Sequence, residues 1–203
     1  PFLLAGALWA AICLTLGTVF SRQQAEAGLR FGLEQVRRVA SQIDFRTLAA
    51  ALGPQFQLDP ASLPARDSRD RVLVARAPHL ASGIGEPIVR LLSGTAGTGR
   101  AGLKAVSILT IRDDWLVVAL SSNRFDQPGR VRLAHPVTER DRNLWEHRAE
   151  YSEGPMSTNA GSFEFLRLPL VTSDGTMLGG LEFANARGGY APFRARTAPF
   201  VST

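Results

Sequence analysis

The sequence is poor in cysteine and in lysine, and it also lacks a stripe of basic charge. Cys13 is the only cysteine among the 203 residues, so a disulfide within the chain is excluded. Lys104 is the only lysine, and arginine supplies the remaining basic charge. The net charge is +5, but acidic residues stand between the basic ones almost everywhere. Because no basic stripe results, we do not expect nucleic-acid binding.

The chain also lacks the spacings that metal and cofactor sites need. None of the three histidines has a second ligand-type residue at metal-site spacing; they are His79, His135 and His147. The glycine-rich stretch 94–102 matches G-x-G-x-x-G, but a short helix is expected before it and a strand after it. The dinucleotide fingerprint requires the reverse order, so a flexible loop is the better interpretation. We expect no metal and no cofactor.

Catalytic arrangements are missing as well. No G-x-S-x-G sequence occurs, so the serine-hydrolase elbow is absent. Asp113 and Asp114 are adjacent, so their side chains point apart and cannot act as a paired acid and base. Turn chemistry explains these two residues better. The sequence therefore predicts a protein that is not an enzyme.

Against these absences stands one long apolar run at the start of the chain. It extends from Phe2 to Phe20 without a charged residue or a proline. At 1.5 Å per residue a helix of this length spans about 28 Å, close to a hydrocarbon core of about 30 Å. We expect residues 1–20 to form a single transmembrane helix in the lipid bilayer. Its small residues offer close helix contacts within the membrane, namely Gly6, Ala7, Ala10 and Ala11.

The rest of the chain predicts a juxtamembrane helix, one α+β domain and a tail. Residues 21–44 carry an apolar stripe at helical spacing, which fits either a dimer seam or packing on the same domain. Residues 45–186 form the predicted domain, and 187–203 an extended tail rich in Gly, Pro and Arg. The chain begins at Pro1, and we expect it to be a piece of a longer protein. Whether a second span or an output domain follows Thr203 stays open.

Within the domain, turn and capping signals place the elements. Asp44 is the expected N-cap of a helix over 45–52, and Thr138 with Asp141 resembles a capping box for a helix over 138–150. Further predictions are a short helix over 86–92 and strands over 72–75, 105–111, 115–121, 163–171 and 176–183. In the run 163–170 the alternation places Arg167 on one face and the leucines on the other. Pro169 indicates an edge position or a bulge.

One cluster is a candidate ligand site. Arginines and aromatic residues gather on and after the helix expected over 138–150: Arg140, Arg142, Trp145, His147, Arg148 and Tyr151. An arginine such as Arg142 could hold a small anionic or amphoteric ligand that Trp145 and Tyr151 enclose. The alternative is structural: Leu144 and Trp145 cover the sheet while the arginines face water.

Two stretches carry a resemblance to a known family. AVSILTIRDDWLVVALSS (105–122) and FEFLRLPLVTSDGTMLGGLEFA (163–184) follow an anchor and a long helix. This order resembles the extracytoplasmic Cache-type, or PAS-like, sensor domains of bacterial receptors. The resemblance implies an antiparallel sheet with flanking helices, a small-molecule ligand and a homodimer. It further implies a single-pass protein of the bacterial inner membrane with its domain in the periplasm. Arg142 and Trp145 stand three apart, whereas some members read amino acids through an Arg-x-Trp motif.

Two functions of different classes follow. The first is a non-enzymatic sensor-like input domain. The second is an accessory subunit that stabilises a large membrane complex, such as a photosynthetic or respiratory assembly, through its anchor and its extrinsic domain. In that case the partners are membrane proteins around the anchor helix.

Overall fold

The computed structural model describes residues 38–64, 73–96, 103–123, 128–158 and 161–186. Residues 38–42 are helical and precede α2, which runs from Phe45 to Leu52. The helices that follow are η1 (Pro60–Ser62), η2 (Pro78–Ser82), α3 (Glu86–Ala96) and α4 (Glu139–His147). The strands are β1 (Leu73–Arg76), β2 (Leu103–Arg112), β3 (Trp115–Ser121), β4 (Arg130–Pro136), β5 (Tyr151–Thr158), β6 (Gly161–Val171) and β7 (Met177–Ala186).

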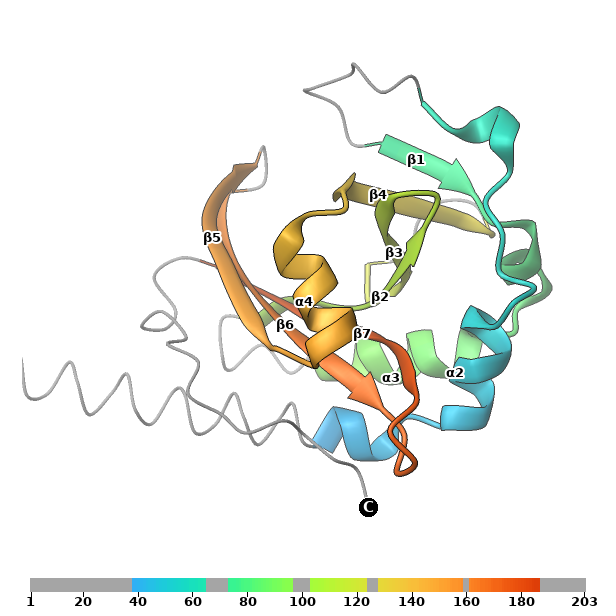
Figure 1. Ribbon diagram of the computed structural model, residues 1–203, viewed down its shortest axis with the longest axis horizontal. Coiled ribbons are helices and arrows are strands. Elements are labelled where there is room, and N and C mark those ends of the chain that lie inside the picture. The colour runs from blue at the N-terminus through green and yellow to red at the C-terminus, as the bar shows by residue number, and fades with distance from the viewer. Residues whose placement is uncertain (1–37, 65–72, 97–102, 124–127, 159–160, 187–203) are drawn as a thin grey trace, which may run out of the picture.

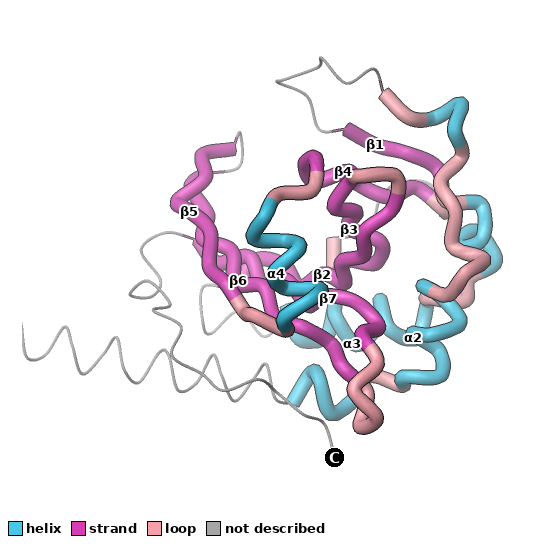
Figure 2. Tube along the Cα trace, viewed as in Figure 1, coloured by secondary structure: helices cyan, strands magenta, loops and turns pink. Residues whose placement is uncertain are grey.

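The strands form a seven-stranded antiparallel sheet in the order β1-β4-β3-β2-β7-β6-β5 (Figure 1). The central pair β2–β7 joins the two halves of the described chain, because β1, β3 and β4 lie on one side and β5 and β6 on the other. Helix α4 covers one face of this sheet, and α2 and α3 lie toward the other (Figure 2). The α+β class and the antiparallel sheet with flanking helices are thus confirmed.

The main apolar core lies on the face covered by α2 and α3, hereafter the α2/α3 face. It is centred on side chains that are almost fully buried, including Leu48, Phe56, Leu92, Ile108 and Leu181. The alternation predicted for β6 holds, because Leu166, Leu168 and Leu170 all join this core. Burying one such side chain contributes about 1.5–3 kcal/mol, so this face supplies most of the driving force for folding.

The helix caps predicted at Asp44 and Thr138 are confirmed. Asp44 caps α2, its carboxylate accepting the Arg46 N–H at 3.0 Å. Thr138 and Asp141 form a capping box at α4: the Thr138 N–H donates to Asp141 Oδ2 at 2.8 Å, and the Thr138 hydroxyl accepts the Asp141 N–H. Each cap satisfies helix N–H groups that have no partner inside the helix.

The β2–β3 turn explains the adjacent aspartates. Arg112 pairs with Trp115, so Asp113 and Asp114 form a two-residue loop. Their φ angles are 51° and 62°, the left-handed conformation that a type I′ hairpin requires. Aspartate is among the few residues other than glycine that tolerate it. The interpretation of this pair as turn residues is therefore confirmed.

The sequence pattern did not predict strands β4 and β5. β4 alternates arginines with apolar residues, and its sequence RVRLAHP has no long apolar run. β5 contains Gly154 and Pro155, which usually mark a loop. In the sheet β5 is an edge strand, and its register shifts between Glu153 and Met156, so a bulge accommodates the two breakers.

Pro169 occupies a local edge, as predicted. It pairs with Gly180 of β7, but it lies beyond Arg167, the last residue of β6 that pairs with β5. The missing N–H of proline is therefore not required by β5 at this position.

The predicted anchor, most of the helix predicted over 21–44 and the tail 187–203 lie outside the described residues. The same holds for the predicted membrane contacts at Gly6, Ala7, Ala10 and Ala11. Within the part of the chain that the structure describes, none of the helices combines the length and the apolar character needed to cross a bilayer.

Candidate functional site

A row of polar side chains crosses the sheet face that α4 covers. Tyr151 pairs with Arg167, Arg167 with Glu182, Glu182 with Ser107, and Ser107 with Ser121. Residues directly opposite one another in neighbouring strands lie on the same face. Five strands thus contribute one polar residue each to a continuous line, which we call the polar row.

Four members of the polar row are buried although they are polar or charged, and Tyr151 is half-buried. Arg167 is 3% exposed, Glu182 2% and Ser107 3%. The Ser107 and Ser121 hydroxyls bond to one another at 3.0 Å. Burying an ionised group costs several kcal/mol unless partners compensate it. The contacts of Arg167 therefore decide whether the row is stable.

Arg167 lies at the centre of a dense set of contacts. Its Nε donates to Glu182 Oε2 at 2.9 Å, and its Nη1 lies 3.0 Å from Glu153 Oε2. The same Nη1 is 2.5 Å from the Tyr151 hydroxyl and 3.1 Å from His135 Nε2. The guanidinium carbon is 5.4 Å from the centre of the Tyr151 ring. Groups from β4, β5 and β7 thus converge on one buried cation.

Helix α4 adds Asp141, which is fully buried, and this carboxylate has two roles. Its Oδ2 accepts from the backbone and hydroxyl of Thr138 and so caps the helix. Its Oδ1 accepts the Tyr151 hydroxyl proton and lies 3.6 Å from Arg167 Nη1. The start of α4 and the polar row therefore depend on the same side chain.

Burial and hydrogen bonding shift the pKa values of these groups in opposite directions. Burial raises the pKa of Tyr151, so its phenol stays protonated. Burial also acts to raise the pKa of Asp141, but hydrogen bonds from Thr138 and Tyr151 outweigh it and lower that pKa. Burial acts to lower the pKa of Arg167, but the Glu182 carboxylate and Tyr151 more than offset this effect, so that pKa is raised.

His135 joins this cluster as an acceptor. A guanidinium has only donors, so His135 Nε2 accepts from Arg167 Nη1 in this contact. Its Nδ1 donates to the Pro136 carbonyl at 2.8 Å and lies 3.6 Å from Asp141 Oδ2. This hydrogen bond fixes the tautomer of the ring.

Arg132 of β4, which lies beside Glu182 of the polar row, is incompletely satisfied. Its Nη2 lies 3.6 Å from Glu182 Oε1, while its buried Nε has no hydrogen-bond partner. An unsatisfied buried donor costs about 1–3 kcal/mol, and such groups are rare enough in native proteins that each calls for a specific explanation. Arg167 pairs with the carboxylates of Asp141, Glu153 and Glu182, and Arg132 with that of Glu182 alone. These two arginines and three carboxylates carry one net negative formal charge.

The three predicted ligand residues lie in different surroundings. Tyr151 belongs to the polar row, and Trp145 packs on an apolar patch of Leu109, Leu116 and Val118. Arg142 is exposed and lines a hollow of about 310 Å³ with Asp114, Trp115, Pro136 and Val137. Neither Trp145 nor Tyr151 lines the hollow beside Arg142, and the role of the three as ligand contacts stays a prediction.

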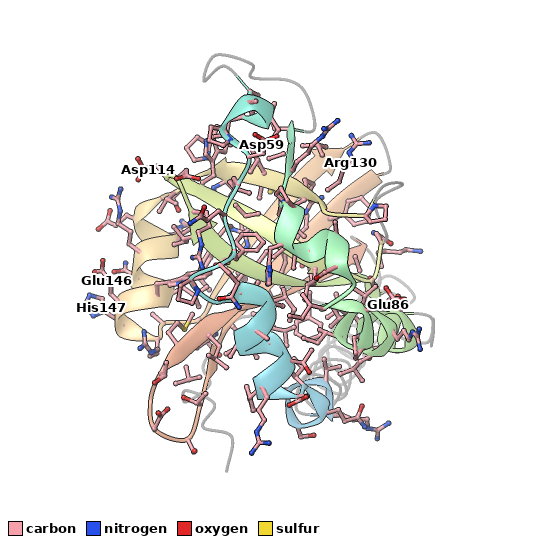
Figure 3. The ribbon with its side chains drawn as sticks, turned by 90° about the vertical axis from the view of Figure 1, so that its right-hand side faces the viewer. Asp59, Glu86, Asp114, Arg130, Glu146 and His147 are labelled. Atoms are coloured by element: carbon pink, nitrogen blue, oxygen red, sulfur yellow. The ribbon has the colours of Figure 1, made fainter. Side chains whose placement is uncertain are left out.

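The outer side of α4 is charged. Glu146 and His147 project from the helix away from the sheet (Figure 3), and Arg140 is also exposed. Leu144, by contrast, is fully buried and Trp145 is half-buried. For this helix the structure matches the interpretation in which Leu144 and Trp145 cover the sheet while Arg140 and Arg142 face water.

Arg167 and Glu182 were not identified as functional residues from the sequence. A signal was present: each is a lone charge inside an apolar strand, in LRL and LEF. A charge in such a position must be paired if the strand is buried. The pairing of β6 with β7 places the two residues directly opposite one another.

Larger hollows lie elsewhere on the described surface. One of about 430 Å³ lies between η2, the start of α3 and the facing ends of β3 and β4, and Ser121 of the polar row lines it. Another, of about 550 Å³, lies between the segment from Phe56 to Pro64 and the β2–β3 turn. Within the described ranges, no three acidic, histidine or cysteine side chains are grouped to bind a metal.

No family model matches this chain. No curated protein matches it either. Among solved structures, the sensory domain of the Campylobacter jejuni chemoreceptor Tlp3 matches with 9% identity and a TM-score of 0.37, over 85% of this chain and 63% of that one. The ligand-binding domain of the same chemoreceptor in complex with L-valine matches with 10% identity and a TM-score of 0.36, over 85% and 62%. Its complex with 4-methylisoleucine gives 13% identity and a TM-score of 0.35, over 80% and 60%.

The chain therefore spans about three fifths of the length of those domains. Those domains are described as the sensory domain and the ligand-binding domain of a chemoreceptor. L-valine and 4-methylisoleucine are ligands of those proteins.

Proposed function

We propose that this chain is the input domain of a membrane-anchored sensor and that it binds a small amphoteric molecule at the polar row, beside Arg132. One observation carries the proposal: oppositely charged groups are buried together on the α4 face, and Arg132 Nε among them has no acceptor. A ligand carboxylate supplies that acceptor, and a ligand cation balances the excess negative charge.

Binding explains this cluster better than catalysis does. A general base needs a pKa near the working pH, but the pKa of Asp141 is lowered. A phenol nucleophile needs an accessible phenolate, but the pKa of Tyr151 is raised by burial. Both groups are thus held in one protonation state, which suits recognition of a fixed charge pattern.

The rigidity of the row supports recognition as well. Its members lie on five hydrogen-bonded strands, and Arg167 has partners on two of them, β5 and β7, and on β4. Groups already fixed in place lose little conformational entropy when a ligand binds. For the whole protein we propose a single-pass inner-membrane location with the domain in the periplasm. The uncharged run from Phe2 to Phe20 supports the membrane span, and the resemblance to extracytoplasmic sensor domains supports the periplasmic side.

A ligand screen tests the proposal. The full chain in detergent is screened by thermal shift against amino acids, dicarboxylates and betaines, alongside Arg132→Gln and the matched control Arg130→Gln. Arg130 lies on the same strand but makes no contact with Glu182. We expect at least one amphoteric compound to raise the melting temperature of the wild type and of R130Q but not of R132Q. Failure of every compound to stabilise the wild type would contradict the proposal.

A second function, the accessory subunit of a membrane complex, is favoured by a different observation. The four partners of Arg167 described above are groups of this protein, so its charge is compensated without a ligand. Such a domain could act as a fixed support beside the complex. Detergent extraction followed by size exclusion separates the two functions, because a subunit co-migrates with its complex at constant stoichiometry and a sensor does not.

A further inference from the structure

Two helices touch one point of β7 from opposite sides of the sheet. Consecutive residues in a strand face opposite sides, so Gly179 faces α2 and Gly180 faces α4. A Cβ on Gly180 would lie 3.2 Å from Trp145 Cη2, and a Cβ on Gly179 would lie 3.1 Å from Leu52 Cδ1 and 2.8 Å from the Leu109 carbonyl. Both helices therefore pack on bare backbone here, and no side chain of β7 separates them.

Each of these helices is tied to a different part of the molecule. Trp145 lies one turn after Asp141 on α4, and Asp141 is bonded to Tyr151 of the polar row. Leu52 is the last residue of α2, and its carbonyl accepts from Arg112 Nη2 at 2.8 Å. Helix α2 in turn follows directly on the helical residues 38–42. The glycine pair thus lies between the candidate ligand site and the N-terminal side of the domain.

We propose that Gly179 and Gly180 form a conformational link through which a shift of α4 at the polar row displaces β7 and is passed to α2. Close-packed interiors transmit displacement because no free volume absorbs it. Contact with backbone strengthens this effect, because a side chain can change rotamer whereas a strand held on both sides cannot. The inference rests on the proposed function in one respect, because ligand binding at the polar row is the event that would move α4 in the cell.

Helix α3 provides a control inside the molecule. It lies on the same face as α2, but it packs mainly on β2 and β3, whereas α2 packs on β7. A disturbance that travels through the glycine pair reaches α2 and leaves α3 unchanged. A general loss of stability affects both helices alike.

Amide hydrogen exchange on the full chain in detergent tests the link without any ligand. Tyr151→Phe keeps the ring but removes the hydroxyl that joins Asp141 to Arg167. We expect exchange in α2 to rise about fivefold or more, the lower end of ordinary coupling between sites, with exchange in α3 unchanged. An equal rise in both helices, or no rise in α2, overturns the proposal.

A second substitution removes one of the two helix contacts with the glycine pair. Trp145→Phe removes the Cη2 atom that approaches Gly180, and Leu52→Val removes the Cδ1 atom that approaches Gly179. Both are conservative, and circular dichroism verifies that each variant is folded. In either background we expect Tyr151→Phe to leave α2 exchange unchanged. A rise as large as in the wild type overturns the link. Because the perturbation is a substitution, this outcome is independent of the ligand screen.

Discussion

The two faces of the sheet are stabilised in different ways. The α2/α3 face is held by apolar side chains such as Leu92 and Ile108, which are fully buried or nearly so. The α4 face is held in part by a buried arginine, three carboxylates and two hydroxyls. Apolar contacts are non-directional and tolerate small shifts, whereas buried charges require their partners at fixed positions. The first face therefore supplies stability, and the second supplies a defined geometry.

The largest expected effect comes from breaking the charged face. Arg167→Met leaves Glu182 buried without its 2.9 Å partner, and we expect a loss of about 3–5 kcal/mol in the free energy of unfolding. Urea denaturation followed by circular dichroism measures it. The double variant Arg167→Met with Glu182→Met should recover part of this loss, because the fully buried carboxylate that lost its partner is removed as well, while Asp141 and Glu153 still lack the Arg167 cation. A double variant as unstable as the single one would contradict this account.

The apolar face gives the next effect. Leu92 is fully buried in the core, and Leu92→Ala removes three of its carbon atoms and leaves a cavity. We expect a loss of about 2–5 kcal/mol by the same measurement. In contrast to the charged pair, stability should be restored only by a nearby substitution that fills the cavity again. Full rescue by a polar substitution would show that this face does not depend on packing.

Acidification should weaken the α4 face first. The pKa of Asp141 is lowered in the folded protein, because hydrogen bonds from Thr138 and Tyr151 outweigh burial. A carboxyl group whose pKa is lower in the folded than in the unfolded protein stabilises the fold at pH values above its unfolded pKa, about 3.9 for aspartate. This stabilisation is lost as the pH falls through the folded pKa. We therefore expect the unfolding free energy to fall below about pH 4 in the wild type and less steeply in Asp141→Asn. Denaturant midpoints measured from pH 6 to pH 3 check this, and identical slopes would contradict it.

The smallest loss of unfolding free energy is expected for an exposed ion pair on α3, in contrast to the buried pair of Arg167 and Glu182. Arg90 Nε lies 3.4 Å from Glu86 Oε1 on α3, with the Arg90 side chain 74% exposed. Surface pairs contribute about 0–1 kcal/mol, so Arg90→Met should change stability by about 0.5 kcal/mol or less. Compared with Arg167→Met, this variant separates the effect of burial from that of charge. A loss comparable to that of R167M would show that burial is not the deciding factor.

The sequence predicts the two faces unequally. Alternation placed Leu166, Leu168 and Leu170 in the core, and capping and turn signals located Asp44, Thr138 and the pair Asp113–Asp114. These are local features that depend on a few consecutive residues. β5 was missed because a bulge in an edge strand tolerates Gly and Pro, and local patterns do not reveal which strand lies at an edge.

The candidate site was harder to predict for a related reason. Ser107, Tyr151, Arg167 and Glu182 are far apart in the sequence, and only the strand order brings them into one line. Tyr151 was named as a ligand residue next to Arg142 and Trp145, but the structure places it beside Arg167 and Asp141. A prediction from neighbouring residues along one helix cannot anticipate partners from three strands.

Arg112 determines how α2 can move. Its Nε donates to the Phe56 carbonyl, its Nη2 to the carbonyls of Leu52 and Gly53, and its Nη1 to Ile111 and Thr110. Lysine, with a single ammonium group, could not join these acceptors in one plane. The C-terminal end of α2 is thus fastened to the β2–β3 hairpin, and any tilt of the helix pivots about that end. The displacement of a tilting helix grows with distance from its fixed end. It is therefore largest at Asp44 and the residues before it, on the side of the chain that leads toward the apolar run.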